Sequence, residues 1–414
     1  MDRVILHSDL DCFYASVECL HNPLLRSKPV AVCGDAELRH GIVLAKNQIA
    51  KGFGVKTGDV IWEAKQKCKD LVIVEANFNQ YIRFSKMARK IYERYTNQIE
   101  TFGIDECWLD VTGSVGAFGS GEKIANEIRE VIKFELGCTA SVGVSWNKIF
   151  AKLGSDMKKP DATTVITKSN YKDKIHNLPA EDLLYVGRAT KAKLQKLGIK
   201  TIGGIAKSDV EFLKRYLGKW GEYLWTFANG LDMSPVAFSD EKSVVKSIGN
   251  STTTVRDLTC LDDILMIVTV LAESVAARLR EQWLKGQVVS ISLTDSKMVG
   301  WAKQKKIVEP TFNSAYIIDV AMNLCKKNYS FQNPIRNIGV KVSDLSSADA
   351  PHQVNLFLDE EKRKRAESLE YTLDSVRRRF GHNAIRRATL HLDPTLTNLN
   401  PKQEHTIHPY SYFK

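Results

Sequence analysis

The segment Thr101-Phe-Gly-Ile-Asp-Glu-Cys-Trp-Leu-Asp-Val-Thr112 carries two adjacent acids between apolar runs, which predicts a β-strand on each side of them. A second acidic segment, His7-Ser-Asp-Leu-Asp-Cys-Phe-Tyr14, follows an apolar pair in the same way. Adjacent residues of a regular strand point to opposite faces, so Asp105 and Glu106 can share one site only if a turn or bulge separates two strands. The sequence therefore predicts a hairpin tip at these two acids.

The carboxylates of Asp9, Asp105 and Glu106 would repel one another if they met in a buried site. Mg²⁺ removes that conflict, because it is a hard ion that prefers oxygen ligands and is commonly held by carboxylates together with substrate phosphates. Two such ions can bind the attacking and leaving oxygens of an in-line displacement. These residues predict phosphoryl or nucleotidyl transfer. The alternative for an isolated acidic pair is an exposed turn.

The composition is that of a basic globular protein. Of 414 residues, 43% are hydrophobic and 26% are charged, which is enough for about two to four packed domains. The formal net charge is +11. The basic residues are spread over several segments, as a groove along a phosphate backbone requires, although solvated helix faces give the same pattern. The sequence favours a polyanionic partner.

The eight cysteines include no Cys-x-x-Cys pair, and several lie in apolar runs where a reduced thiol packs as a small hydrophobic group. The N-terminus enters a charged strand directly, and no apolar run approaches the length of a membrane span. We therefore expect a cytoplasmic, monomeric protein with no membrane partner.

Secondary-structure signals divide the chain into blocks. Residues 1–22 and 77–166 have the order strand, helix, two strands, helix, strand, which predicts a ferredoxin-like split βαβ palm with helices on one face, within an α/β (α+β) multidomain protein. Residues 23–76 are predicted as a small insertion of short strands and helices, and residues 167–238 as a helical block. Residues 241–344 are predicted as a separate α/β domain, and residues 345–414 as a tail with a charged, solvated helix.

Three long motifs resemble the Y-family translesion DNA polymerases, the class that includes DinB and UmuC. They are Ser8-Asp-Leu-Asp-Cys-Phe-Tyr-Ala-Ser-Val-Glu18, Gly103-Ile-Asp-Glu-Cys-Trp-Leu-Asp110 and Ser141-Val-Gly-Val-Ser-Trp-Asn-Lys-Ile-Phe-Ala-Lys-Leu-Gly-Ser-Asp-Met-Lys-Lys-Pro160. The resemblance implies that the blocks before the tail are a palm, fingers, thumb and little finger. It also implies low-fidelity, template-directed addition of dNTPs to a primer 3′ end on primer-template DNA, in translesion synthesis.

The resemblance also assigns roles to residues. The catalytic residues that bind two Mg²⁺ ions would be Asp9, Asp105 and Glu106. The backbone carbonyl of Leu10 would complete the second metal site. Tyr14 is at the steric-gate position, where an aromatic ring under the sugar excludes a ribose 2′-hydroxyl; a core aromatic is the alternative. Lys159 is where the family binds the incoming triphosphate, a role that suits a compact ammonium; a solvated lysine is the alternative.

The fingers depart from the DinB pattern. Where that pattern has Asn-Tyr-x-Ala-Arg, this chain has Asn47-Gln-Ile-Ala-Lys51, which is more similar to UmuC. Gln48 can donate one hydrogen bond and Lys51 can supply a charge, but a lysine cannot reproduce a bidentate guanidinium contact, so we expect weaker nucleotide binding. Phe13 is assigned to the same nucleotide site. Gly103 replaces the usual serine before Ile-Asp-Glu, and the sequence alone does not explain that change.

Three apolar residues match family positions that form the roof over the templating base, namely Val32, Ile42 and Leu44. Bulky side chains there would narrow the room for large adducts. The alternative is that they fill the core of a strand pair.

The helical block contains the segments 184–194 and 197–202, which resemble a helix-hairpin-helix that donates backbone N–H groups to a DNA phosphate. Tyr185 occupies the first glycine position of the usual turn. An ordinary αα-hairpin is the alternative.

The tail segment Gln353-Val-Asn-Leu-Phe357 resembles the bacterial sliding-clamp peptide. In that peptide a glutamine fixes the register and a Leu-Phe pair fills an apolar pocket, so Gln353, Leu356 and Phe357 would bind the clamp. The alternative is a turn whose Leu356 and Phe357 pack on the chain's own core.

Two other functions fit parts of the sequence. Nucleotide cyclases use a palm with paired acids, but they do not need the thumb-like and little-finger-like blocks. A catalytically silent DNA-binding or clamp-binding factor is the second, with Gln48, Lys51 and Gly103 as signs of a decayed site. The intact acidic motifs favour the polymerase.

Overall fold

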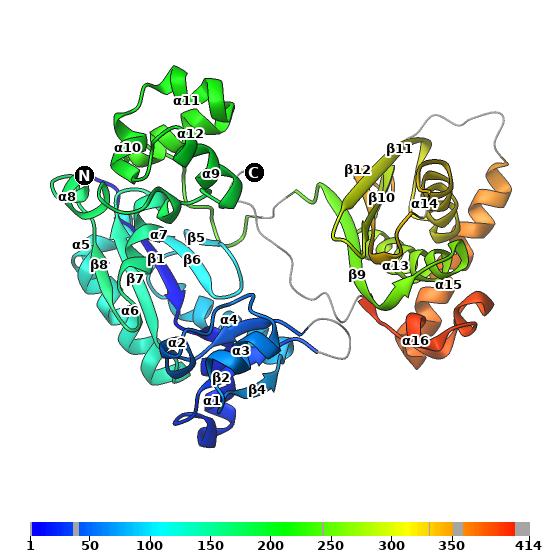
Figure 1. Ribbon diagram of the computed structural model, residues 1–414, viewed down its shortest axis with the longest axis horizontal. Helices are drawn as coiled ribbons and strands as arrows, with labels where there is room; N and C mark the ends of the chain where they lie inside the picture. Colours follow the sequence, from blue (N-terminus) through cyan, green and yellow to red (C-terminus); the bar gives the residue numbers. More distant parts are fainter. Residues whose placement is uncertain (1, 36–40, 242–243, 331, 351–358, 402–414) are drawn as a thin grey trace. The chain divides into compact units, whose positions relative to one another are not determined.

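The computed structural model describes residues 2–35, 41–241, 244–330, 332–350 and 359–401 (Figure 1). They form two compact units, one from the first 34 residues with residues 42–241, and the other mainly from residues 244–401. In these described ranges, no helix is both long enough and apolar enough to span a membrane. All eight cysteines are free thiols.

The first unit is built on a five-stranded sheet with β1 at its centre. In spatial order the strands are β5 (Ile99–Thr101), β6 (Glu106–Asp110), β1 (Ile5–Leu10), β7 (Ala140–Ser145) and β8 (Thr163–Val165). The first four strands pair antiparallel, and β8 adds parallel to β7. This is the predicted split βαβ arrangement with one extra edge strand.

Helices cover both faces of this sheet, so the prediction of helices on one face is wrong. The helices α4 (Phe78–Tyr92) and α6 (Gly121–Leu136) share a core with Leu6 of β1. Ile5, the neighbouring residue, packs on the opposite side in a core with α7 (Lys148–Met157). Every residue of β1 is buried, because a central strand with apolar side chains on both faces needs a cover on each.

The fingers block is a small α/β insertion with its own core. Its sheet has the order β3-β2-β4. It follows α1 of the palm, and the elements in chain order are α1 (Phe13–His21), β2 (Val30–Cys33), β3 (Val43–Lys46), α2 (Gln48–Gly52), α3 (Ile61–Lys67) and β4 (Val72–Glu75).

The thumb block is helical, as predicted, and it packs in the same core as α7. Its helices are α8 (Tyr171–Ile175), α9 (Arg188–Lys196), α10 (Ile202–Lys207), α11 (Val210–Leu217) and α12 (Lys219–Ala228). The short helix α5 (Val115–Phe118) belongs to the palm.

The segment after α12 is fixed along the palm by hydrogen bonds to its backbone. Arg3 donates to the carbonyl of Ser234 at 3.0 Å, Ala237 N–H donates to Glu100 Oε2 at 2.9 Å, and Ser239 N–H donates to Asn97 O at 2.9 Å. The chain therefore leaves the first unit only after Ser239.

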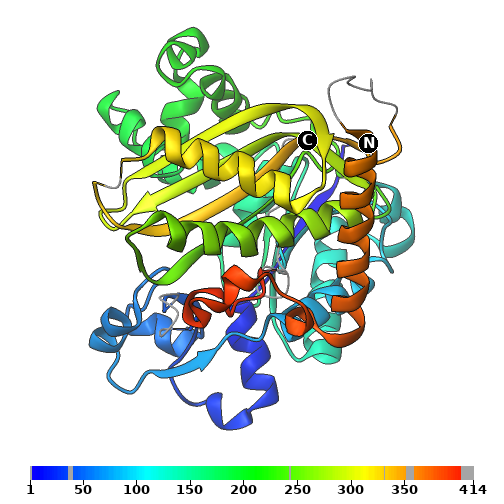
Figure 2. The ribbon, with the colours of Figure 1, turned by 90° about the vertical axis from the view of Figure 1, so that its right-hand side faces the viewer.

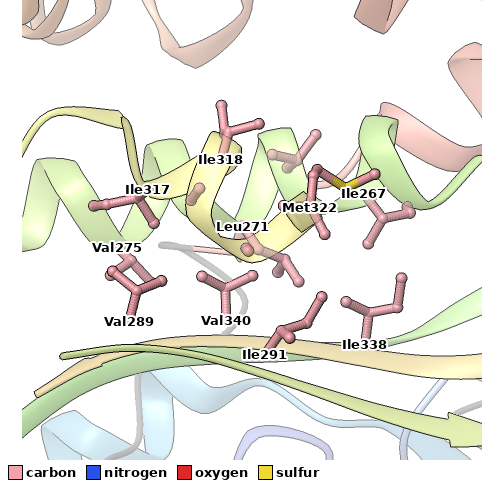
Figure 3. Packing of buried hydrophobic residues seen from close by; sticks show 14 of the residues in the cluster. Ile267, Leu271, Val275, Val289, Ile291, Ile317, Ile318, Met322, Ile338 and Val340 are labelled. Atoms are coloured by element: carbon pink, nitrogen blue, oxygen red, sulfur yellow. The ribbon is translucent and has the colours of Figure 1, made fainter. Parts of the chain in front are cut away.

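The second unit is a four-stranded antiparallel sheet with two helices on one face (Figure 2). The helices are α13 (Leu261–Glu281) and α14 (Ser314–Asn328). The strands, in spatial order, are β11 (Gly300–Thr311), β10 (Leu284–Asp295), β12 (Ile335–Ser347) and β9 (Ser247–Leu258). Figure 3 shows the apolar core between the helices and the sheet, including Ile267, Leu271, Ile317, Met322, Ile291 and Val340.

The tail helix is not a fully solvated helix. The tail contains α15 (Glu360–Phe380) and α16 (Pro394–Thr397). Two leucines that follow α15 in the chain, Leu390 and Leu396, lie in the core of the second unit. Glu370, near the middle of α15, is only 5% exposed. The prediction failed because this helix packs through charged side chains, which hydropathy patterns count as exposed.

Those charges form a set that we call the Arg280 cluster: Arg280, Arg377 and Arg387 with Glu273, Glu370 and Asp374. Arg280 of α13 contacts Glu370 at 2.8 Å and Asp374 at 2.6 Å. Glu273 contacts Arg377 at 2.8 Å and Arg387 at 2.7 Å. The clamp-like segment with Gln353, Leu356 and Phe357 lies outside the described residues.

Candidate active site

The three predicted acids come together at one end of β1 and β6. Asp9 lies directly opposite Glu106 in the strand register, so their side chains share a face of the sheet. Asp105 ends the turn between β5 and β6, and its carbonyl accepts a hydrogen bond from Leu10 N–H at 3.1 Å. This turn is the predicted hairpin tip, and it brings the third carboxylate to the other two.

Gly103 lies in the same turn with φ +147°, a conformation that side chains with a Cβ rarely adopt. A Cβ at this position would make only an ordinary contact with Asp105 Oδ1, at 3.5 Å, so the backbone conformation and not the space favours glycine. The shape of the turn therefore accounts for the glycine, which need not indicate a decayed site.

Burial and mutual repulsion both disfavour the charged forms of these carboxylates unless a cation lies nearby. Burial raises the pKa of Asp105 to about 7, and the negative charges of Asp9 and Glu106 add to this effect. Burial also raises the pKa of Asp9. Perturbed carboxylates of this kind are typical of functional sites.

Two lysines meet the carboxylates. Lys159 Nζ lies 2.7 Å from Asp9 Oδ2 and 3.0 Å from Asp156 Oδ1. Lys152 Nζ lies 2.9 Å from Glu106 Oε2, 3.4 Å from Asp9 Oδ2 and 3.3 Å from Asp156 Oδ2. Lys159 was predicted from the sequence as a site residue, and Lys152 was not. The four-residue spacing of Lys152 and Asp156 does indicate one helix face, but only the fold turns that face toward the acids.

His7 is completely buried beside Glu106. Its Nδ1 lies 2.8 Å from Ser155 Oγ, and its Nε2 lies 3.4 Å from Glu106 Oε2. Burial lowers the pKa of His7 well below its usual value, and the positive charge of Lys152 adds to this effect. The imidazole is therefore neutral, and the positive charge beside the carboxylates comes from the lysines.

Asp11, two residues after Asp9, has a different role. Its Oδ1 accepts a hydrogen bond from Ser141 Oγ at 2.8 Å. Its Oδ2 accepts from Thr139 Oγ1 at 2.9 Å and from Asp161 N–H at 2.8 Å. These bonds occupy the carboxylate, so Asp11 joins β1 to the loop around Asp161 and is not a free ligand.

Tyr14 lies on α1 beside the acids. Its ring stacks on Tyr81 with centroids 4.3 Å apart and planes 9° from parallel, and it contacts Phe78 edge-on at 5.9 Å. Tyr81 is fully buried and donates a hydrogen bond to Glu18 Oε1 at 2.6 Å. Burial raises the pKa of Tyr14 to about 12, with a further contribution from the charge of Asp105. The Tyr14 ring therefore has a rigid support that the sequence did not reveal.

The fingers residues Gln48 and Lys51 are exposed on α2. Lys46, at the end of β3, was not predicted as a site residue. Burial lowers the pKa of Lys46, and the positive charges of Lys51 and Lys159 lower it further. Lys51 and Lys159 therefore each repel the ammonium of Lys46, and positive charges grouped in this way attract a polyphosphate.

The remaining apolar site residues differ in exposure. Phe13 is 3% exposed and Val32 is completely buried, both in the core that contains Leu10. Ile42 is 41% exposed, and Leu44 is partly exposed.

In the thumb, Tyr185 has φ +72°, the left-handed conformation for which glycine is usually selected. Its ring packs against Trp220 at a centroid distance of 5.3 Å. The chain thus keeps the backbone shape of the predicted turn with a tyrosine at the glycine position.

The residues at the acidic end of β1 fit Mg²⁺, because carboxylates and a main-chain carbonyl are the oxygen donors that this ion prefers. Across the described ranges, no three His, Cys, Asp or Glu side chains are already grouped as a metal site. Lysine ammonium groups instead contact the same oxygens, at 2.7 Å for Asp9 and 2.9 Å for Glu106. These oxygens are therefore arranged to bind a cation, and the ammonium groups of Lys159 and Lys152 contact them.

Two family models match the chain. Residues 8–156 match the impB/mucB/samB family, and residues 245–356 match the impB/mucB/samB family C-terminal domain. The first covers the acidic motifs and the fingers, and the second covers most of the second unit before its tail.

Curated relatives match over nearly the whole length. The chain is 54% identical to DNA polymerase IV of Acetivibrio thermocellus, over 96% of this chain and 100% of the relative. It is 38% identical to DNA polymerase IV 2 of Bacillus subtilis (strain 168), over 94% of each protein. Among solved structures, a Y-family DNA polymerase chimera matches with TM-score 0.73 and 26% identity, over 82% of this chain and 98% of the chimera.

Proposed function

This chain belongs to the impB/mucB/samB family of Y-family DNA polymerases, and we propose that Asp9, Asp105 and Glu106 are its two-metal catalytic centre for adding deoxynucleotides to a primer 3′ end. The chain is a DNA polymerase of the translesion class. One observation carries the assignment of the centre: three carboxylates converge beside β1, where burial and the charges of Asp9 and Glu106 raise the pKa of Asp105 to about 7.

The chemistry divides between metal and protein. When bound, two Mg²⁺ ions would lower the pKa of the primer 3′-hydroxyl and shield the triphosphate while pyrophosphate leaves. Asp9 and Glu106 would hold the ions from rigid strands, and Asp105 would do so from the hairpin turn, with the Leu10 carbonyl as a further donor. Positioning the primer and the triphosphate in line is the main contribution of the protein.

Nucleotide binding would use the lysines. Lys159 and Lys51, with Lys46, would neutralise the triphosphate, and Gln48 would donate a hydrogen bond from the start of α2. Each ammonium is a point charge and not a bidentate fork, so we expect the nucleotide to be held more weakly than by an arginine. Ile42 and Leu44 have the exposure that contact with a templating base requires. Phe13 and Val32 would act through packing beneath the site.

Tyr14 would exclude ribonucleotides. Its ring is held flat on Tyr81 with centroids 4.3 Å apart, so it cannot easily turn away from a 2′-hydroxyl. We expect Tyr14→Ala to raise ribonucleotide incorporation by at least about tenfold, since an unrelieved clash of about 1.4 kcal/mol has that effect. Single-nucleotide insertion with dCTP and rCTP measures the ratio, and Phe134→Ala, which changes an exposed aromatic residue on α6, is the control.

The partners follow from this function. Primer-template DNA would be bound by the thumb and by the exposed face of the second unit's sheet. On β12 of that sheet, Lys341 is exposed between buried Val340 and Val342. Contacts to phosphate would bind any sequence, as template copying requires. We further propose that the protein acts as a monomer in the cytoplasm and binds a bacterial sliding clamp through Gln353, Leu356 and Phe357.

Primer extension with Mg²⁺ and all four dNTPs, on undamaged and abasic templates, tests the catalytic centre. We expect distributive extension by the wild type and a loss of at least about a thousandfold in Asp105→Ala/Glu106→Ala, because two-metal positioning supplies most of the rate. DNA affinity, measured by fluorescence anisotropy, should not change in that variant.

Glu130→Gln is the matched control, since it removes an exposed acid from α6 of the same unit. Extension that persists in the double variant would overturn the assignment of the acids. Intact DNA binding without extension by the wild type would favour a silent binding factor.

A further inference from the structure

We propose that Lys152 is a built-in counter-cation of the palm. Its ammonium holds Asp9 and Glu106 together when no metal is bound, and it transfers to Asp156 when Mg²⁺ binds. Lys152 is then a positioning residue, which acts on the reaction through the carboxylates. This inference rests on the proposed function, because it takes Asp9 and Glu106 as metal ligands.

The position of Lys152 is that of a shared cation. Its Nζ lies 2.9 Å from Glu106, 3.4 Å from Asp9 and 3.3 Å from Asp156. The side chain is only 13% exposed, so water screens these contacts poorly. Burial opposes the charge, but the carboxylates of Glu106, Asp156 and Asp9 together raise the pKa of Lys152.

The contacts of Lys152 differ from those of Lys159 in one respect. Both lysines contact Asp9 and Asp156, but Lys152 also bridges Asp9 to Glu106, which lie opposite each other on β1 and β6. It therefore neutralises the pair of carboxylates between two strands. Without it, their mutual repulsion would act against the strand pairing at this end.

Asp156 offers a second place for the same ammonium. It is one helical turn after Lys152 on α7, so the lysine can turn toward it without a shift of the backbone. The Asp156 side chain is 46% exposed. A metal ion beside Asp9 and Glu106 would repel the ammonium, and Asp156 would accept it. Lys152 thus keeps the acids assembled before the metal binds and remains paired afterwards.

Mg²⁺ titration of the melting temperature of the full chain, without DNA or nucleotide, tests this proposal. We expect Lys152→Met to lower the melting temperature in EDTA and to lower the Mg²⁺ midpoint by about tenfold, because the metal no longer competes with an ammonium. Asp156→Asn should raise the midpoint, since the ammonium loses its second partner. In the double variant the effect of Asp156→Asn should disappear.

Lys152→Arg keeps the charge and is the folding control, and Lys152→Gln replaces the methionine variant if that one does not fold. An unchanged Mg²⁺ midpoint in the neutral variants would overturn the proposal. So would independent, additive effects of the two substitutions. A failure of the proposed centre is distinct, because the wild type and Asp105→Ala would then show the same response to Mg²⁺.

Discussion

The two units each bury a cluster of charged side chains, but only one cluster is balanced. In the Arg280 cluster, three arginines meet three carboxylates in ion pairs of 2.6 to 2.8 Å. In the palm, the four carboxylates are those of Asp9, Asp105, Glu106 and Asp156, and among the described residues two lysines, Lys152 and Lys159, form ion pairs with this group. The palm cluster therefore has more negative than positive groups, whereas the Arg280 cluster has equal numbers of each.

One buried polar atom of the palm agrees with this difference. Within the described residues, His7 Nε2 has no hydrogen-bond partner. Glu370 of the Arg280 cluster instead accepts a hydrogen bond from Ser314 N–H at 2.9 Å. In a balanced cluster the loss of one partner is costly because it leaves a buried charge uncompensated, whereas a cluster with excess negative charge is suited to bind a cation from outside.

Removal of the central arginine should have the largest effect on stability. We expect Arg280→Met to destabilise the second unit by about 3–5 kcal/mol, because it leaves Glu370 and Asp374 buried without their partner. Urea unfolding followed by circular dichroism measures the loss, and the two units should give separable transitions.

Arg365→Met is the matched control, because Arg365 of α15 pairs with Glu361 of that helix and its side chain is 81% exposed. We expect no measurable change there. If the two variants cost the same, the Arg280 cluster does not hold the tail helix.

The same kind of substitution in the palm should act in the opposite direction. We expect Asp105→Asn to stabilise the metal-free protein by about 1 kcal/mol at pH 8, because it removes one carboxylate from an excess and because active-site strain often opposes stability. Asp374→Asn, in the balanced cluster, should destabilise. Thermal melts in EDTA of the two variants test the comparison, and a loss of stability in both would contradict it.

The pH dependence of that difference should identify Asp105. Its folded pKa of about 7 lies above the ordinary value of 3.8, so the folded state binds the proton more tightly than the unfolded state. The contribution of Asp105 to stability is therefore full below pH 3.8 and is lost as pH rises to about 7.

The other carboxylates contribute the same pH dependence to the wild type and to Asp105→Asn. The difference in stability between the two proteins therefore isolates the pH dependence that comes from Asp105. In thermal melts in EDTA between pH 5 and pH 8, the stability of the variant should increase relative to that of the wild type as pH rises. A constant difference across that range would mean that Asp105 titrates normally.

The smallest effect should come from the hydrogen bond beneath the acids. Ser155→Ala removes the hydroxyl that lies 2.8 Å from His7 Nδ1 and that donates to Lys152 O at 2.7 Å. We expect a loss of about 1 kcal/mol in stability, the usual value for one buried hydrogen bond, with extension on undamaged DNA reduced severalfold at most. No effect on either readout would mean that His7 needs no support from α7.

Much of the palm could be predicted from sequence because its signals are local. Apolar runs of strand length, the adjacent acids Asp105 and Glu106, and the apolar spacing of the helices are each readable within a few residues. The hairpin tip followed from the alternation of side chains along a strand. The thumb was likewise predicted as helical from periodicity.

What the sequence did not reveal depends on contacts between distant residues. Arg280 pairs with Asp374, which lies 94 positions later, and charged partners at that distance leave no periodic pattern. Val32 matched a roof position but is completely buried, since the pattern of an apolar strand does not say which face is covered. Tyr185 has φ +72°, and tertiary packing against Trp220 rather than a glycine accompanies that conformation.

The hydrogen bonds that fix the chain along the palm as far as Ser239 leave a short connection to β9, which begins at Ser247. Eight residue steps span at most about 30 Å. A tether of that length keeps the second unit at an effective concentration on the order of millimolar around the first. The DNA contacts proposed for the thumb and for the second unit's sheet would then act as one bivalent site, which could release DNA at one contact without losing the template.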